Sequence, residues 1–283
     1  MFRPFLLPMA KNANMVVLLT GGSSGIGAAA ARMLAQAGMT VYSASRHPAG
    51  AETFPSGGKI VPAVLDVNDA AATERLVDQI VLAEGSLDAV VCNAGNGMAG
   101  SAEDTSEQEY RYQFETTFFG AVKTVKAALP VMRRQGHGRI ITVSSVAGFA
   151  PIPYQSFYSA AKSALLSWTE AVRSEVRRFG IQTCVILPGD VRTGFTAARR
   201  IAAAAESGDS AYYATMHHSI ATMARDEQNG MSPQVIARVI IRQLRRPRMR
   251  ASVTPGVLYK GIRFLIRVLP DTPVMRIIEY LYK

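Results

Sequence analysis

Short apolar runs alternate along this chain with longer segments in which apolar and polar residues are mixed. Short apolar runs are typical of strands that are buried on both faces of a sheet. We predict strands over residues 15–19, 40–45, 59–65, 88–92, 139–144 and 182–187. We predict helices over residues 26–37, 70–83, 107–134 and 156–179, the third interrupted near Gly120 and Pro130. Because strands and helices alternate at βαβ lengths, the sequence predicts an α/β fold with a doubly wound parallel sheet.

The chain has 283 residues, enough for one large domain, and neither a linker nor an internal repeat divides it. We predict a single domain over residues 15–255, an N-terminal arm over 1–14 and a basic helical extension over 256–283. Two prolines and no convincing cleavage site favour a disordered or packing arm over a signal peptide. No apolar run approaches the ~18 residues of a membrane span.

The formal net charge of +10 is concentrated in residues 238–270, which hold nine Arg and Lys residues and no Asp or Glu. The basicity is therefore a local surface feature, and without a recognised module we expect no nucleic-acid partner. Cys92 and Cys184 lie inside apolar runs, which indicates buried thiols and a reducing, cytoplasmic location. The pair His217-His218 has no further ligand at metal spacing, so we expect no metal site.

The candidate chemistry lies in Tyr158 and Lys162, which are one helical turn apart. This spacing puts a phenol and an ammonium side by side on one helix face. The ammonium would favour the phenolate and lower a pKa that starts near ~10, so Tyr158 is a candidate proton donor and acceptor. Ser145, thirteen residues upstream of Tyr158, is a candidate hydroxyl to hold a substrate oxygen.

A glycine-rich turn, Thr-Gly-Gly-Ser-Ser-Gly-Ile-Gly at residues 20–27, joins the first strand to the first helix. Glycines let the backbone turn tightly and approach a pyrophosphate, whose charge meets the amino end of the helix. The position after the first strand favours nucleotide binding over a plain tight connection.

With these motifs the chain resembles the short-chain dehydrogenase/reductase family over roughly residues 15–195. The resemblance depends on an ordered set with family-like spacing: residues 20–27, Asp66, Asn93-Ala94-Gly95, Ser145, Tyr158, Lys162, Pro188-Gly189, Val191 and Thr193. It implies a Rossmann-type fold and hydride transfer between a nicotinamide dinucleotide and a carbonyl–alcohol pair.

The resemblance also implies a role for each of these residues. Tyr158 would be the acid/base, Lys162 would bind ribose hydroxyls and depress the pKa of the tyrosine, and Ser145 would orient the carbonyl. The implied cofactor-binding residues are Gly21, Ser23, Ser24, Gly25, Ile26 and Gly27 at the pyrophosphate, Asp66 and Val67 beside the adenine, Asn93, Ala94 and Gly95 near the central sheet, and Pro188, Gly189, Val191 and Thr193 at the nicotinamide, with Tyr158 and Lys162.

The choice of dinucleotide depends on the end of the second strand, where the chain has Ser45 and Arg46. An acidic residue there would bind the ribose 2′-OH and repel a 2′-phosphate. A hydroxyl and a guanidinium suit the 2′-phosphate instead, so we predict NADP(H), with NAD(H) as the alternative.

The chain departs from the family at Thr117, where the family usually has an asparagine. That asparagine is thought to hold a helix kink and a water that leads from the lysine to bulk solvent. Threonine keeps one hydroxyl and lacks the amide, so the departure concerns the proton relay.

Residues 194–230 correspond to the variable substrate loop of the family. Their aromatic and apolar side chains suit a hydrophobic pocket, although helix packing explains them equally well. The candidate substrate residues are Phe149, Tyr154, Phe195, Tyr212 and Met216.

The basic extension mixes leucine and isoleucine with Lys260, Arg263 and Arg267, a pattern that suits an anionic membrane surface. The alternative is a helix packed on its own domain or on a dimer partner. We favour packing because Pro270 and Pro273 interrupt the pattern.

The sequence thus predicts an NADP(H)-dependent oxidoreductase that interconverts a bulky apolar ketone or aldehyde and its alcohol, such as a steroid, a retinoid or a lipid. The alternatives are a 3-oxoacyl-thioester reductase, whose acidic carrier protein would dock on the arginines, and a non-catalytic dinucleotide sensor or scaffold. We expect a cytoplasmic homodimer or homotetramer, with peripheral membrane contact through the extension as a further hypothesis.

Overall fold

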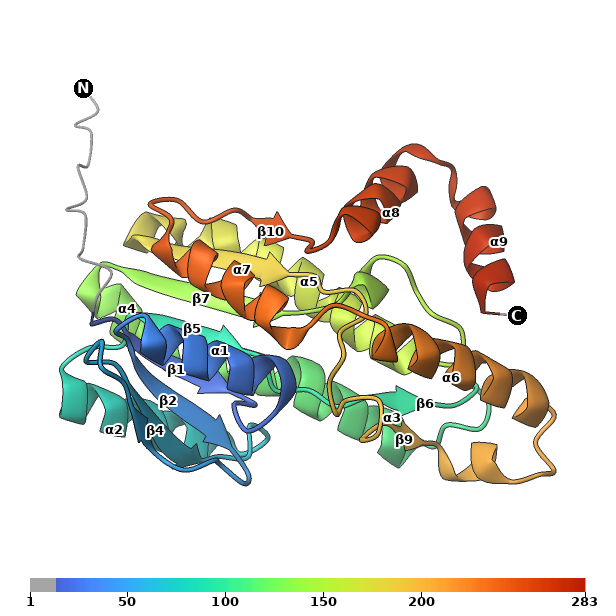
Figure 1. Ribbon diagram of the computed structural model, residues 1–283, viewed down its shortest axis with the longest axis horizontal. Helices are drawn as coiled ribbons and strands as arrows, with labels where there is room; N and C mark the ends of the chain where they lie inside the picture. The colour runs from blue at the N-terminus through green and yellow to red at the C-terminus, as the bar shows by residue number, and fades with distance from the viewer. Residues whose placement is uncertain (1–13, 283) are drawn as a thin grey trace.

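A computed structural model describes residues 14–282 of the chain, with a central sheet covered by helices on both faces (Figure 1). The expected N-terminal arm therefore lies almost entirely outside the described residues. The sheet has eight strands in the order β10-β8-β7-β5-β1-β2-β4-β3. All neighbours pair in parallel except β3 and β4, which are antiparallel. The predicted doubly wound parallel sheet is confirmed.

The strands of this sheet are β1 (Val16–Thr20), β2 (Thr40–Ser45), β3 (Glu52–Thr53), β4 (Lys59–Val64), β5 (Ala89–Cys92), β7 (Gly138–Val143), β8 (Ile181–Ile186) and β10 (Ser252–Val253). A second, two-stranded sheet pairs β6 (Met98–Ala99) with β9 (Arg200–Ile201) in parallel. The six predicted strands are present within one or two residues. The sequence missed the four two-residue strands, because two residues are too few to show a periodic pattern.

The helices are α1 (Gly25–Gln36), α2 (Ala70–Glu84), α3 (Glu107–Phe114), α4 (Gly120–Gln135), α5 (Ser156–Val176), α6 (Tyr213–Gln228), α7 (Pro233–Arg245), α8 (Val257–Val268) and α9 (Asp271–Leu281). Short 3₁₀ turns cover Val146–Gly148, Arg177–Phe179 and Ala203–Glu206. Local signals fix several helix starts. The Asp69 side chain caps α2, Ser106 and Glu109 form a capping box at α3, and Pro233 begins α7.

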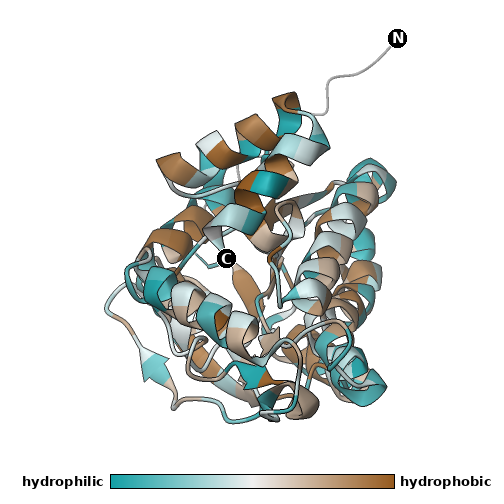
Figure 2. Cartoon of the chain, turned by 90° about the vertical axis from the view of Figure 1, so that its right-hand side faces the viewer, coloured by the Kyte–Doolittle hydropathy of each residue, from teal (hydrophilic) through white to brown (hydrophobic). Residues whose placement is uncertain are grey.

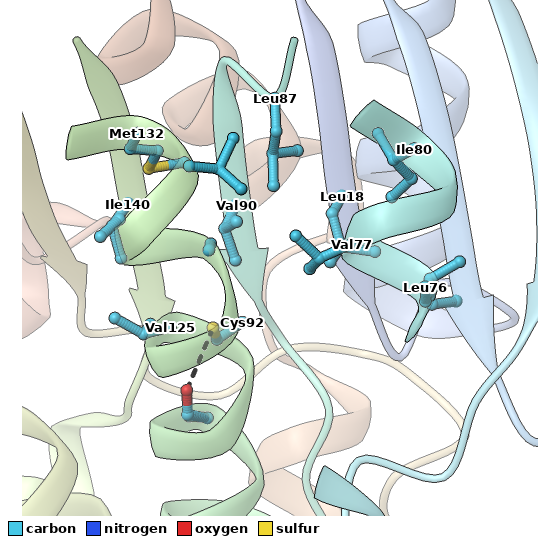
Figure 3. Packing of buried hydrophobic residues seen from close by; sticks show 14 of the residues in the cluster. Leu18, Leu76, Val77, Ile80, Leu87, Val90, Cys92, Val125, Met132 and Ile140 are labelled. Carbon is cyan, nitrogen blue, oxygen red and sulfur yellow. Dashed lines mark hydrogen bonds between the residues drawn. The ribbon is translucent and has the colours of Figure 1, made fainter. Parts of the chain in front are cut away.

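Each face of the sheet has its own apolar core. On one face, Leu18 and Val90 of the strands pack with residues of α2, α4 and α5, as Figure 3 shows for Ile80 and Val125. On the other face, α1 and α7 cover the strands through residues such as Leu34 and Ile240. Parallel strands require this burial on both faces, which explains their uninterrupted apolar runs.

The long helix predicted over residues 107–134 is broken by one π-helical turn, Glu115–Phe119, that joins α3 to α4. The predicted break near Gly120 is therefore confirmed, and the predicted break near Pro130 is wrong. Pro130 lies inside α4 on its exposed face, where water can satisfy the carbonyl that loses its hydrogen-bond donor.

The carboxyl ends of β1 and β5 form the switch point of the sheet, where the strand order reverses. Ligands of open α/β sheets bind at this place. Beyond the sheet, α8 and α9 form the predicted C-terminal helical extension, which Figure 1 shows standing out from the body. Within residues 14–282 no helix is both long enough and apolar enough to cross a bilayer.

The two thiols offer a test of this core. Cys92 and Cys184 are free and buried, and burial raises the pKa of each thiol to about 12. We expect neither thiol of the native chain to react with Ellman's reagent at neutral pH, and both to react after unfolding in guanidinium chloride. A native chain that released one equivalent of thionitrobenzoate quickly would contradict the packing around that thiol.

Candidate active site

The glycine-rich turn approaches its neighbours so closely that side chains cannot be accommodated there. A Cβ on Gly27 would lie 2.0 Å from the Gly21 carbonyl oxygen, and a Cβ on Gly21 would lie 2.8 Å from Cα of Ala94. Gly21 and Gly25 also have φ values of +68° and +52°, which residues with a side chain rarely adopt. The first turn of α1 therefore presents bare backbone, while Ser23 and Ser24 are exposed beside it.

The turn after β5 is held against the glycine turn by hydrogen bonds. The Thr20 hydroxyl accepts from the backbone N–H groups of Asn93 and Ala94, both at 3.2 Å. In return the Asn93 amide donates to the carbonyls of Gly21 at 3.0 Å and Thr20 at 3.3 Å. Asn93 thus joins the two loops at the switch point.

Ser145, Tyr158 and Lys162 come together at the carboxyl end of β7. The Ser145 hydroxyl accepts from the Ala147 N–H at 3.1 Å, which starts the short 3₁₀ turn after the strand. Tyr158 and Lys162 lie on the inner face of α5, only 9% and 5% exposed, with the lysine Nζ 5.8 Å from the centre of the phenol ring. The i, i+4 spacing therefore places the phenol and the amine on the same face of α5.

The electrostatics of this pair differ from the sequence-based expectation. Burial raises the pKa of Tyr158 to about 12, although its hydrogen bond with Ser145 opposes the rise. Burial also lowers the pKa of Lys162 to about 8. Lys162 donates a hydrogen bond to the Val143 carbonyl at 2.9 Å. Desolvation of the phenol is the largest cause of the pKa shift of Tyr158. The predicted lowering of the tyrosine pKa by Lys162 is not found in this arrangement.

Thr117 lies in the π-helical turn and is fully buried beside two amide side chains. Gln113 donates to the Thr117 hydroxyl at 2.7 Å and to the Asn96 side-chain oxygen at 3.0 Å, and Thr117 donates to the same oxygen at 3.0 Å. A Cβ on Gly95 would lie 3.6 Å from the Lys162 Nζ and 3.7 Å from the Thr117 Oγ1. The lysine and the hydroxyl therefore face one small space.

The helix kink expected of the family's asparagine is thus present here with a threonine. The amide that position 117 lacks is supplied one turn earlier by Gln113. Within the described part of the chain, Gln113 Oε1 and Asn96 Nδ2 are buried without a partner, so this cluster keeps unused hydrogen-bonding capacity. Sequence reasoning missed both residues, although an amide four positions before Thr117 was a usable signal.

The remaining predicted cofactor residues surround the same edge of the sheet and fit a dinucleotide. At the end of β2, the Ser45 hydroxyl is buried without a partner among residues 14–282, and Arg46 beside it is exposed. An orphaned hydroxyl and an exposed guanidinium are groups that a phosphate would satisfy. Thr193 lies against the glycine turn, since a Cβ on Gly25 would be 3.2 Å from its side chain.

Five further predicted residues have structural contacts in this region. Asp66 is exposed and accepts from the Asn68 N–H at 2.9 Å. Val67 is buried against Gly120, and Val191 is buried and forms a parallel bridge with Met231. Pro188 and Gly189 follow β8, and the Pro188 carbonyl accepts from the Val146 N–H at 2.8 Å. The loops after β7 and β8 are therefore tied together.

The substrate candidates divide into two groups. Phe195 lies over the catalytic candidates, with its ring 5.8 Å from that of Tyr158, and Phe149 lies under the Arg263 guanidinium at 5.6 Å. Tyr154 and Tyr212 instead line a cavity of about 520 Å³ that Glu279 and Tyr282 of the extension also line. Met216 is fully buried in a small packing cluster with Ala202 and Ala205 and does not line this cavity.

One residue that reaches this region, Tyr259 of α8, has no local signal in the sequence. Its ring covers Gly189, where a Cβ would lie 2.2 Å from the ring. Its hydroxyl donates to the Asp190 carboxylate at 2.5 Å and accepts from the Asp190 N–H at 3.0 Å. Burial raises the pKa of Asp190, and both burial and this hydrogen bond raise the pKa of Tyr259. The extension is therefore anchored on the turn after β8.

Comparison with known proteins decides the family. The model of the family described as short chain dehydrogenase matches residues 15–204, a segment that contains the glycine turn and all three catalytic candidates. The chain is a short-chain dehydrogenase/reductase. It is thus an oxidoreductase of the class that acts on CH–OH groups with NAD(P) as acceptor.

Two curated relatives of this short-chain dehydrogenase/reductase are reductases. A 3-ketodihydrosphingosine reductase of Bacteroides thetaiotaomicron is 37% identical over 244 residues, which cover 86% of this chain and 88% of the relative. The ketoacyl reductase HetN of a Nostoc species is 36% identical over 193 residues, with 66% and 67% covered. Among solved structures, a short-chain dehydrogenase of Streptomyces avermitilis has a TM-score of 0.78 at 27% identity, covering 92% of this chain and 95% of that one.

A substitution in the glycine turn tests the close approach. Gly27→Ala places a methyl group 2.0 Å from the Gly21 carbonyl oxygen, so the turn must shift. We expect a loss of about 1–3 kcal/mol in the free energy of unfolding. We also expect dinucleotide affinity to fall, measured by titration of NADPH fluorescence. Gly50→Ala is the matched control, because its Cβ would meet no atom within 4 Å. Equal stability and affinity in both variants would contradict the geometry.

Proposed function

We propose that this short-chain dehydrogenase/reductase uses NADP(H) to interconvert a bulky, lipid-like ketone and its alcohol. The observation that carries the proposal is the buried Tyr158, held between Ser145, Lys162 and the Phe195 ring at the carboxyl edge of the sheet. Such a site combines a proton donor with an apolar cover, which suits an apolar carbonyl substrate.

The three residues divide the work in the reduction direction. The pKa of Tyr158 is raised to about 12, so the phenol is protonated at neutral pH and can donate its proton to a carbonyl oxygen. Ser145 holds that oxygen as negative charge develops on it. Lys162 would bind ribose hydroxyls, and the hydrogen-bonded cluster of Gln113, Asn96 and Thr117, which meets the lysine around Gly95, would form part of the route that recharges Tyr158. The bound dinucleotide supplies the hydride.

The preference for NADP(H) is supported by the end of β2. Arg46 is exposed there and Ser45 has an unused hydroxyl, and no acidic side chain occupies either position. A guanidinium binds a phosphate through two parallel hydrogen bonds, which an unphosphorylated ribose cannot use.

For the substrate, we propose a long-chain 3-ketone of the kind that the Bacteroides relative reduces by name. The 37% identity extends over 86% of this chain and therefore includes much of the substrate loop. The ring of Phe195 beside Tyr158 and the ring of Phe149 in the turn after Ser145 are consistent with an alkyl chain.

A 3-oxoacyl thioester is the second candidate substrate, because the Nostoc relative is named a ketoacyl reductase. Its acidic carrier protein would dock on the arginines of α7. Assays with 3-ketodihydrosphingosine and with acetoacetyl thioesters separate the two substrates by their kcat/KM values.

We also propose that the protein is cytoplasmic, forms a homodimer or homotetramer and contacts a membrane through α8. An aromatic patch on the π-helical turn and α5 supports the oligomer: Phe119 is 42% exposed, and the rings of Phe118 and Trp168 lie edge to face beside it. The exposed apolar side of α8 supports the membrane contact. Light scattering after size-exclusion chromatography measures the oligomeric state.

The catalytic proposal predicts the behaviour of Tyr158→Phe. This variant keeps the ring that packs on Phe195 and removes the proton donor. We expect kcat for NADPH-dependent ketone reduction to fall by about 10²–10⁴, with NADPH affinity unchanged. Tyr110→Phe is the control, because it also removes one phenol hydroxyl and keeps a ring that stacks on Phe157, at 4.9 Å between centroids, and Tyr110 is not one of the three catalytic candidates. Normal turnover by Tyr158→Phe would refute the mechanism.

The cofactor proposal predicts the behaviour of Arg46→Asp. Because a charged hydrogen bond is worth about 1.5–3 kcal/mol, we expect NADPH affinity to fall about tenfold to a hundredfold. NADH affinity should hold or rise, since the new carboxylate can accept from the ribose 2′-OH. Arg75→Asp is the control, because Arg75 is a 65% exposed helix residue. Unchanged NADPH affinity in Arg46→Asp, or tighter binding of NADH by the unmodified protein, would overturn the assignment.

A further inference from the structure

A second cavity, of about 290 Å³, lies between the outer side of α7 and the connection from β10 to α8. Five cationic residues line it: Arg238, Arg242, Arg246, Arg250 and Lys260. No acidic residue lines the cavity, and within residues 14–282 none of the five forms a salt bridge. The site is separate from the catalytic candidates, none of which lines it.

The charge arrangement is costly for the protein alone. Arg238 and Arg242 lie at i, i+4 spacing on one side of α7, where like charges destabilise a helix, and Arg246 follows as the C-cap of α7. An anion in the cavity would relieve this repulsion. Guanidinium groups bind phosphate through paired, charge-assisted hydrogen bonds, so a phosphate group is the anion that this set fits.

The start of α8 adds to the attraction. Gly256 lines the cavity and is the N-cap of α8, with no side-chain cap and no acidic residue in the first turn. The amino end of a helix carries partial positive charge and free N–H groups. The cavity thus combines five side-chain cations with one helix terminus.

The surface next to the cavity indicates which kind of molecule would carry the phosphate group. Apolar side chains of α8 point to solvent: Leu258 is 68% exposed and Phe264 is 65% exposed, with Val257, Leu265 and Val268 also exposed. Figure 2 shows brown apolar and teal polar segments alternating along the C-terminal helices. A soluble phosphate would use the cations alone, whereas a phospholipid at a bilayer surface would use both the cations and the apolar residues.

We propose that this cavity binds the phosphate headgroup of an anionic phospholipid while the apolar side of α8 enters the bilayer interface. The first turn of α8 supports this arrangement residue by residue. Leu258 is exposed, Tyr259 packs on Gly189 beside the catalytic region, and Lys260 lines the cavity. A bilayer bound in this way would lie next to the loop after β8, which Tyr259 contacts at Gly189.

A second copy of the chain fits this surface less well. In a two-fold dimer whose axis passes through the cavity, five cations of one copy would meet five cations of the other. The inference rests on the membrane contact proposed for α8 and not on the identity of the ketone, so the two can fail separately.

Vesicle flotation of the full chain tests the proposal. We expect flotation with equimolar phosphatidylcholine and phosphatidylglycerol, and none with phosphatidylcholine alone. In a cavity variant, Arg238→Gln/Arg242→Gln/Arg250→Gln, partitioning should fall about a hundredfold, because each lost cation near an anionic surface weakens binding several-fold. A Phe264→Ser/Leu265→Ser variant should also lose flotation, because it removes apolar contact.

The matched control is Arg133→Gln/Arg134→Gln/Arg177→Gln, which removes three exposed arginines that do not line the cavity. It should float like the unmodified chain. Equal losses in the cavity and control variants would show that overall charge is responsible, and full flotation of the cavity variant would exclude the cavity. Failure of the unmodified chain to float would end the proposal.

Two further measurements distinguish the phospholipid site from a soluble-phosphate site and from a dimer interface. Calorimetric titration with inorganic phosphate should give no saturable binding, and saturation that the cavity variant abolishes would identify a soluble-phosphate site instead. If the Phe264→Ser/Leu265→Ser variant changes the oligomeric state, α8 is an interface between copies. Reduction of a detergent-dispersed ketone should be unchanged in the cavity variant, so loss of membrane binding and loss of the proposed activity remain distinguishable.

Discussion

The site depends on a close contact between backbone and backbone at the carboxyl ends of β1 and β5. There the carbonyl of Gly21, in the turn after β1, leaves no room for a Cβ on Gly27. The Asn93 amide donates a hydrogen bond to the same carbonyl and so holds the turn after β5 against it. Because this contact fixes where two loops and the start of α1 lie, it decides where a pyrophosphate can be bound. The three catalytic candidates can act on a substrate only if the dinucleotide is bound at that edge of the sheet.

The second determinant is the burial of charge. Lys162 is held in the interior, where it donates to the Val143 carbonyl, and desolvation moves its pKa and that of Tyr158 in opposite directions. Each shift favours the neutral form, which leaves the tyrosine as an acid. The π-helical turn places the Thr117 hydroxyl at the same small space beside Gly95 as the Lys162 amine, and the Gln113 and Asn96 amides hold that hydroxyl in place.

The C-terminal extension connects the catalytic region to the outer surface of the molecule. Tyr259 packs on Gly189 from one side of α8, while other positions of the same helix expose apolar residues next to a cationic cavity. A single helix therefore contacts the turn after β8, the cavity and the solvent. This arrangement agrees with the lipid-like substrate that we propose.

The sequence by itself determined the layered fold and the three catalytic candidates, because both are encoded in local patterns: apolar runs for buried strands, glycines for the turn, and i, i+4 spacing for Tyr158 and Lys162. Only the tertiary structure decided the sign of the pKa shift at Tyr158, the packing of Met216, the amide at Gln113 that accompanies Thr117, and the contact of Tyr259 with Gly189. These features depend on desolvation and on contacts between residues far apart in the chain, and no local pattern records either of them.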